Sequence, residues 1–151
     1  MNEDKTGVAT AAPGSKIDRE TAEAEFFRYC DNNEIEYDES SMNEDEKDSF
    51  DDIKKTFVKA CMAGRVEVDG TSLKYTLSKF SAESVRNKPI ILKRPGGNAF
   101  SSMDGFKERE NVKKLHAFMS AMTGQDLKYF TLVDALDWKF FSGMATLFLS
   151  L

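Results

Sequence analysis

Apolar and polar residues alternate most regularly in the stretch RVEVDGTSLKYTL, residues 65–77. Asp69-Gly70 is a pair typical of the tight turns that join antiparallel strands, so the stretch predicts a β-hairpin. With Val68 placed opposite Thr71, the apolar side chains emerge together on one face of the hairpin. They are Val66, Val68, Leu73, Tyr75 and Leu77. Such a hairpin needs a helix or a further strand to cover its apolar face.

Helical spacing precedes the hairpin. Residues 17–30, IDRETAEAEFFRYC, have helix-forming composition, and the acidic stretch after them predicts a loose surface linker. A second helix is predicted in SFDDIKKTFVKACMAG, where Ser49 and Asp52 resemble a capping box. Its apolar residues Phe50, Ile53, Phe57 and Cys61 recur on one face, and Gly64 lies where a helix would end.

After the hairpin, Ile90–Lys93 predicts a third strand, and the spacing predicts a helix over about 102–122 that Thr123-Gly124 ends. Asp126 is expected to cap a short turn, and Asp134 is expected to cap a closing helix. Two apolar stripes run side by side along that helix, a width that indicates burial on two sides. One stripe is Phe140, Met144, Leu147 and Leu151, and the other is Phe141, Ala145 and Phe148.

These elements predict an α+β fold: a small antiparallel sheet, made of the β-hairpin plus one further strand, with helices packed on it. The C-terminal half is expected to be helical. The predicted organisation is a disordered N-terminus over 1–16, an acidic helical or loop arm over 17–48, and an α+β domain over 49–151.

Charge separates the two parts of the chain. The net charge is −5, yet residues 1–53 hold 17 Asp and Glu against 5 Lys and Arg, whereas residues 54–151 hold 9 against 16. An arm of this composition is usually a solvated tail. The alternative is that residues 17–53 fold back on basic side chains of the body. The candidates for that contact are Lys93, Arg94, Lys113 and Lys114.

Two properties bear on the compartment. The stretch from Phe140 to Leu151 is too short to span a bilayer, which takes about 20 apolar residues. No secretory signal is visible before Ile17, so Cys30 and Cys61 are expected to be reduced thiols in a cytosol. Neither a membrane nor an oxidising compartment is therefore expected.

Catalytic and ligand-binding motifs are weak. His116 is the only histidine and lacks the partners that a base or a metal ligand needs. Asp134 and Asp137 could pair as in a glycosidase, but capping and the helix dipole explain their spacing better. KRPGGN lacks the phosphate-loop pattern, and an acidic chain disfavours nucleic acid. We expect no enzymatic activity, no cofactor, no metal and no nucleic acid.

The second half of the chain resembles the tail assembly chaperones of long-tailed bacteriophages, particularly a small family from contractile-tailed phages and prophages. The matching pieces occur in order: the strand IILKRP, the helix KLHAFMSAMTG, the segment LVDALDW and a closing apolar helix that ends LFL. The resemblance covers about residues 66–151. The acidic segment before the hairpin is longer than in the shortest members of that family.

The resemblance implies a non-catalytic protein of the bacterial host cytoplasm that binds the phage tape measure protein, helps to recruit tail tube subunits, and is absent from the mature virion. It also implies a homo-oligomer and, in many such phages, a longer form made by ribosomal frameshifting. Two alternatives remain open. One is a minor structural tail or connector protein that stays in the virion, and the other is an acidic regulatory adaptor that blocks a basic partner.

The partner-binding residues are expected on the last two long helices, because these carry more apolar side chains than one three-stranded sheet can cover. Methionine and aromatic side chains also suit an adaptable surface for a helical client. The candidates are Phe118, Met119, Met122, Trp138, Phe141, Met144 and Phe148.

Overall fold

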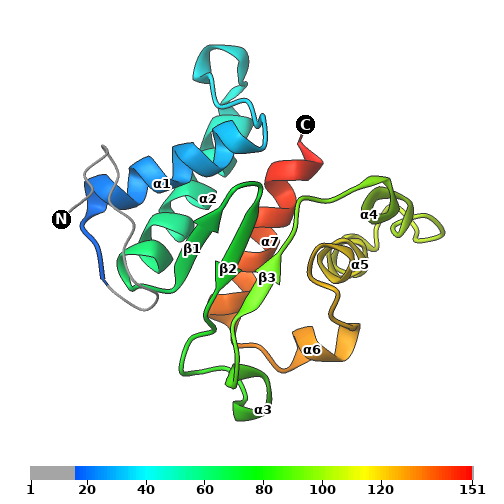
Figure 1. The fold of residues 1–151 in the computed structure, drawn as a ribbon. Coiled ribbons are helices and arrows are strands. Elements are labelled where there is room, and N and C mark those ends of the chain that lie inside the picture. Colours follow the sequence, from blue (N-terminus) through cyan, green and yellow to red (C-terminus); the bar gives the residue numbers. More distant parts are fainter. Residues whose placement is uncertain (1–15, 151) are drawn as a thin grey trace.

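A three-stranded antiparallel sheet lies in front of two long helices in the computed structural model, which describes residues 16–150 (Figure 1). The strands are β1 (Val66–Asp69), β2 (Ser72–Tyr75) and β3 (Ile90–Leu92). The helices of this range are α1 (Arg19–Asn32), η1 (Glu39–Ser41), α2 (Glu44–Met62), α3 (Glu83–Arg86), α4 (Gly97–Ser101), α5 (Asn111–Thr123), α6 (Leu127–Thr131) and α7 (Ala135–Leu149). The α+β prediction is confirmed. The predicted disorder of 1–16 falls, apart from Lys16, outside the described residues.

The sheet order is β1-β2-β3, with the predicted hairpin and third strand both present, but the hairpin register differs from the prediction. Val68 pairs with Leu73 rather than with Thr71, so Gly70 and Thr71 form the turn. Gly70 has φ +61, a conformation that L side chains rarely adopt. The shift is two residues, and side chains alternate with a period of two along a strand. The predicted apolar face is therefore preserved despite the wrong register.

Helices α2 and α7 lie behind the sheet in Figure 1, and α1 packs against α2 and also contacts α7. Helix α2 begins earlier than predicted. Asn43, not Ser49, accepts a hydrogen bond from the Glu46 amide, and the Glu46 carboxylate accepts one from the Asn43 amide. This reciprocal pair satisfies two amides that the helix itself cannot. The acidic stretch predicted as a loose linker therefore includes the first turn of α2.

Helix α1 belongs to the same hydrophobic core as the C-terminal helices. Its side chains Phe26 and Tyr29 are fully buried. The Phe26 ring lies 5.2 Å from the ring of Phe57 on α2, and Tyr29 lies 6.3 Å from Phe148 on α7. Over Arg19–Asn32, the predicted acidic arm is thus a structural helix that covers part of α2 and α7.

The helix predicted over about 102–122 begins later than predicted, at Asn111, and a separate short helix precedes it. Helix α4 ends at Ser101 and α5 begins at Asn111, with Gly105 at φ +91 between them. The predicted end is confirmed, because Gly124 is the left-handed C-cap of α5. Among residues 16–150, no helix is both long and apolar enough to cross a membrane.

Both cysteine thiols lie in the core and are unpaired: Cys30 on α1 and Cys61 on α2. Burial raises the pKa of each thiol to about 12. Because the thiolate is the reactive form, we expect both cysteines to react with a disulfide reagent such as DTNB at pH 8 only slowly in the folded protein. Addition of urea should release both thiols at the unfolding transition. Fast labelling of the native protein would contradict this burial.

Candidate protein-binding groove

Six of the seven predicted partner-binding side chains are buried within the chain itself. Phe118, Met119, Met122, Phe141, Met144 and Phe148 are each no more than 2 % exposed. Trp138 is half-buried, with its ring 4.7 Å from His116. The predicted surplus of apolar surface on the last two helices is therefore wrong. The six buried side chains are covered by other elements of the same chain, such as α1 over Phe148 and α4 over Phe118, so they offer no surface to a partner in the folded state.

Phe140 and Phe141 illustrate how the two stripes of α7 are covered on both sides. Phe140 stacks on Tyr75 of β2 with ring centroids 4.0 Å apart. Phe141 meets Phe130 of α6 edge to face at 5.6 Å. The width of the apolar face did predict burial on two sides. The covering elements belong to the same chain, however.

Asp137 is the most buried carboxylate of the described residues, with a side chain that is 0 % exposed. Its Oδ1 accepts a hydrogen bond from the Tyr75 hydroxyl at 2.6 Å, and its Oδ2 accepts one from the Ser78 hydroxyl at 2.9 Å. The Ser78 amide and the Ser81 hydroxyl also donate to it, and Arg65 Nη1 lies 3.5 Å from Oδ1. The prediction that Asp137 serves the helix dipole missed this role.

This network fastens the segment after β2 to the start of α7. The Asp134 amide donates to the Ser81 hydroxyl, and Asp134 itself caps α7 through the Leu136 amide, as predicted. Burial, with the bond to Asp137, raises the pKa of Tyr75 above its usual range. Ser78 and Ser81 are buried and both hydroxyls donate to the carboxylate. This cluster, which we call the Asp137 clasp, holds the segment after β2 against the start of α7. Neither serine hydroxyl in it is free to act as a nucleophile.

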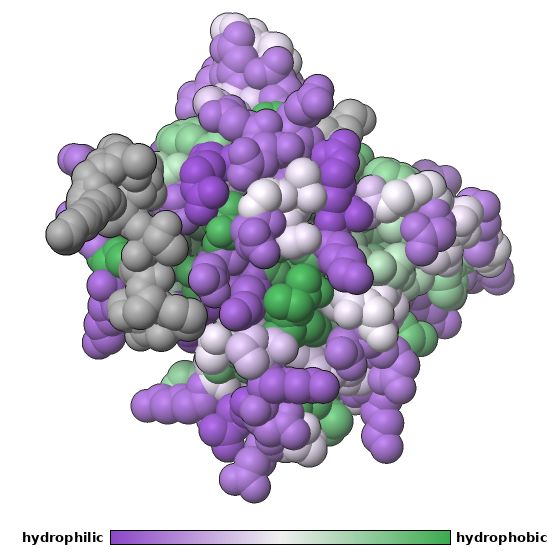
Figure 2. All heavy atoms as spheres, viewed as in Figure 1, coloured by the Kyte–Doolittle hydropathy of each residue, from purple (hydrophilic) through white to green (hydrophobic). Residues whose placement is uncertain are grey.

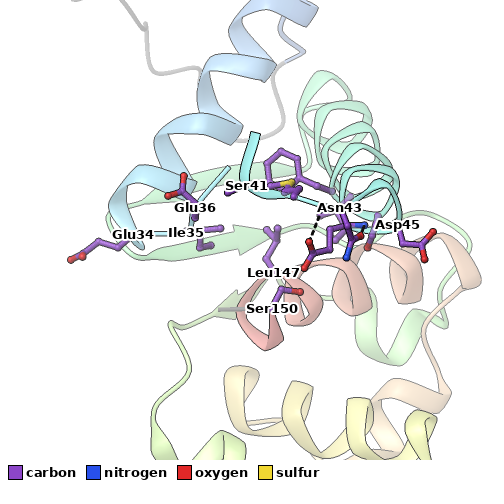
Figure 3. Close-up of a pocket in the computed structure, with 13 residues that line it drawn as sticks. Glu34, Ile35, Glu36, Ser41, Asn43, Asp45, Leu147 and Ser150 are labelled. Atoms are coloured by element: carbon purple, nitrogen blue, oxygen red, sulfur yellow. Dashed lines mark hydrogen bonds between the residues drawn. The ribbon is translucent and has the colours of Figure 1, made fainter. Parts of the chain in front are cut away.

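An open groove lies at the other end of α7, where the chain between α1 and α2 meets the C-terminal turns of α7 (Figure 3). Its volume is about 450 Å³. The floor is apolar and is formed by side chains from three separate parts of the chain. They are Ile35, Met42, Phe50, Ile53 and Leu147. Phe50, Ile53 and Leu147 belong to apolar faces that the sequence predicts, whereas Ile35 and Met42 are isolated apolar residues in an acidic stretch and gave no signal.

The rim of the groove is acidic. Glu34, Glu36, Asp45 and Glu46 line it together with hydroxyl and amide side chains, and no Lys or Arg does. All four carboxylate residues are exposed. Glu34 and Asp45 lie on opposite sides of the opening in Figure 3, with Ile35 and Leu147 between them. The connection between α1 and α2, at the top of Figure 2, is correspondingly hydrophilic.

Backbone geometry at the end of α1 turns the chain into the groove. Asn33 caps α1 and Glu34 has φ +56, the one described non-glycine residue with positive φ. Such a conformation is uncommon and turns the chain sharply, so that Ile35 is buried while its acidic neighbours are exposed. Arg94 holds this corner by donating to the Asn33 carbonyl and by lying over the Phe148 ring.

The basic side chains predicted to contact the acidic segment have different partners in the structure. Arg94 does contact it, but through the main-chain carbonyl of Asn33 rather than through a carboxylate. Lys113 pairs with Glu110 of its own region, at 2.9 Å. Of the four basic residues in the hypothesis, Arg94 contacts residues 17–53, and its partner is an uncharged carbonyl.

His116 lies half-buried between aromatic rings, and burial lowers its pKa. Within residues 16–150, no three His, Cys, Asp or Glu side chains are grouped to hold a metal ion. Comparison of the chain with protein-family models, with curated proteins and with solved structures gave no match. The groove and the Asp137 clasp are therefore interpreted from their own geometry.

Proposed function

We propose that this protein is a phage tail assembly chaperone that holds the tape measure protein soluble and helps to gather tail tube subunits around it. The order of sequence pieces over residues 66–151 supports this assignment. In the structure these pieces correspond to β3, α5, the link from α6 to α7 with the first turn of α7, and the rest of α7, which pack around one core. The proposal describes a non-catalytic protein of the bacterial cytoplasm that leaves before the virion is complete.

The observation that carries the proposal is the groove with an apolar floor and an acidic rim. An apolar floor accepts side chains that an unassembled tape measure protein exposes along its helices. An acidic rim and a net charge of −5 give repulsion between coated complexes, which keeps them apart in solution. Many copies, each with one shallow groove, can cover a long client although each contact is weak.

Co-expression with the tape measure protein of the same phage tests the proposal. We expect the tape measure protein to move from the insoluble to the soluble fraction, and to co-purify with this protein at more than one copy per client. An unrelated acidic protein of similar size is the control for charge alone. The proposal fails if the tape measure protein stays insoluble and does not co-purify.

Mass spectrometry of purified virions separates the chaperone from a structural tail protein. A chaperone is missing from the particle, whereas a minor tail or connector protein is present at a fixed copy number. A regulatory adaptor would instead co-purify from infected cells with a basic DNA-binding protein and not with the tape measure protein.

A further inference from the structure

We infer that the groove between the α1–α2 connection and the end of α7 binds the apolar face of an amphipathic helix whose flanking positions carry Lys or Arg. This inference deepens the proposed function by naming the chemistry of the client segment. It rests on four properties of the groove: its apolar floor, its acidic rim, the C-terminal end of α7 beside it and the helical backbone of its walls.

The floor sets the apolar part of the ligand. Ile35, Phe50, Ile53 and Leu147 are buried yet line the groove, and Met42 adds a flexible side chain at its edge. The volume of about 450 Å³ lies in the range of roughly 300–1,000 Å³ typical of pockets that bury apolar ligands. Apolar side chains that enter the groove lose contact with water on most sides.

The rim sets the charge of the ligand. The residues that line the groove include the four rim carboxylates and no Lys or Arg. A cation that approaches the opening therefore meets attraction on several sides. An acidic segment would meet like charges, which costs affinity and slows association.

The end of α7 favours a cation as well. Leu147 and Ser150 line the groove at the C-terminal turn of α7, where the last carbonyls of the helix carry partial negative charge. No basic side chain lies in that last turn. The opposite wall is the N-terminus of α2, where the capping box satisfies the Asn43 and Glu46 amides and the first turn carries Glu44, Asp45 and Glu46. The anion-attracting end of α2 thus already carries acidic side chains, whereas the one cation described beside the end of α7 is Arg94, which lies over the Phe148 ring.

The helical walls of the groove favour a helix over a strand as the ligand. Two walls of the groove are helices, α2 and α7, whose main-chain groups bond within the helices. No sheet edge lines the groove, because β1, β2 and β3 contribute none of its residues. A segment that binds here gains through side chains, and a helix presents apolar side chains at i, i+3 or i+4, and i+7 on one face.

A binding experiment with three synthetic peptides tests the inference. The first is an amphipathic helix of Leu and Ala with Lys flanking the apolar face, the second carries Glu in place of Lys, and the third has the composition of the first in an order that destroys the apolar face. Fluorescence anisotropy at low salt should show binding of the first peptide only. Its affinity should fall as salt is raised, because the rim charges are screened.

Matched variants locate the site. Glu36→Gln with Asp45→Asn removes two rim charges, and Glu39→Gln with Asp48→Asn removes two charges from exposed residues of the same region that do not line the groove. The rim pair should weaken the Lys peptide roughly 5- to 10-fold, and the control pair less than roughly 2-fold. Ser49→Trp, at an exposed lining position of α2, should block the groove and abolish binding while the thermal unfolding midpoint is kept.

The outcomes distinguish this inference from the proposed function. If the tape measure protein is held soluble but Ser49→Trp has no effect on peptide or client, the function stands and the groove inference is overturned. If the peptides bind as expected while the tape measure protein is not solubilised, the groove inference stands and the function fails. If Ser49→Trp instead dissociates an oligomer of the protein and the Lys peptide does not bind, the occupant is a second copy and the inference is overturned.

Discussion

Asp137→Ala should lower the free energy of unfolding by about 3–5 kcal/mol, because it removes the buried carboxylate to which several donors of the network bond. The Tyr75 hydroxyl, the Ser78 amide and hydroxyl, and the Ser81 hydroxyl would lose their shared partner inside the core. Each buried donor without a partner costs about 1–3 kcal/mol, and neighbouring donors relax together, so the costs do not add in full. Equilibrium unfolding in urea measures the change.

Asp134→Ala is the matched control, since the two carboxylates lie three residues apart at the start of one helix. Asp134 accepts a hydrogen bond from the Leu136 amide as the N-cap, so its loss should cost only about 1 kcal/mol. The difference between the two variants reports the buried network alone. Equal losses for both would show that Asp137 acts through the helix dipole, as its sequence position first indicates.

Phe141→Ser should destabilise the protein by about 4 kcal/mol, a large fraction of the roughly 5–15 kcal/mol that holds a domain folded. Its ring is 1 % exposed and contacts the rings of Tyr75 at 5.3 Å and Phe130 at 5.6 Å. Truncation leaves a cavity between β2, α6 and α7 and places a hydroxyl in it. Circular dichroism on heating should show a transition at a clearly lower temperature.

Phe80→Ser is the control for Phe141→Ser, because the Phe80 side chain is 63 % exposed. That change should alter the free energy of unfolding by less than about 0.5 kcal/mol. The predicted binding surface and the observed core position give opposite expectations for Phe141→Ser. A partner-facing ring would leave stability unchanged and weaken client binding, whereas the core ring of the structure lowers stability first.

Local patterns identified most of the elements. The alternation around Gly70 determined the hairpin face, and it did so even with the wrong register because the shift was two residues. Caps were readable where one side chain decides them, as at Asp126 and Asp134, since a cap depends on residues within a single turn. The cap of α2 was misplaced because the acidic stretch offers several side chains suitable for that role.

The binding surface was not predictable in the same way. Exposure of an apolar stripe depends on which other element covers it, and that element can be far away in the sequence. Helix α1 covers Phe148 of α7 through Tyr29, a contact across more than a hundred residues that no periodicity reveals. The Met- and Phe-rich residues predicted to bind a partner therefore form the core. The groove instead includes Ile35 and Met42, which lie in an acidic stretch.

The amino-acid sequence by itself determined the α+β class, the three strands, the C-terminal end of α5, the starts of α6 and α7, and the acidic character of the N-terminal region. Only the tertiary structure decided which apolar side chains stay accessible, that Asp137 is a buried acceptor while Asp134 is a cap, and that the floor of the groove joins Ile35, Ile53 and Leu147. The physical reason is range. Caps, turns and alternation arise from neighbours within a few residues, whereas burial and the pairing of a buried charge depend on contacts between distant segments.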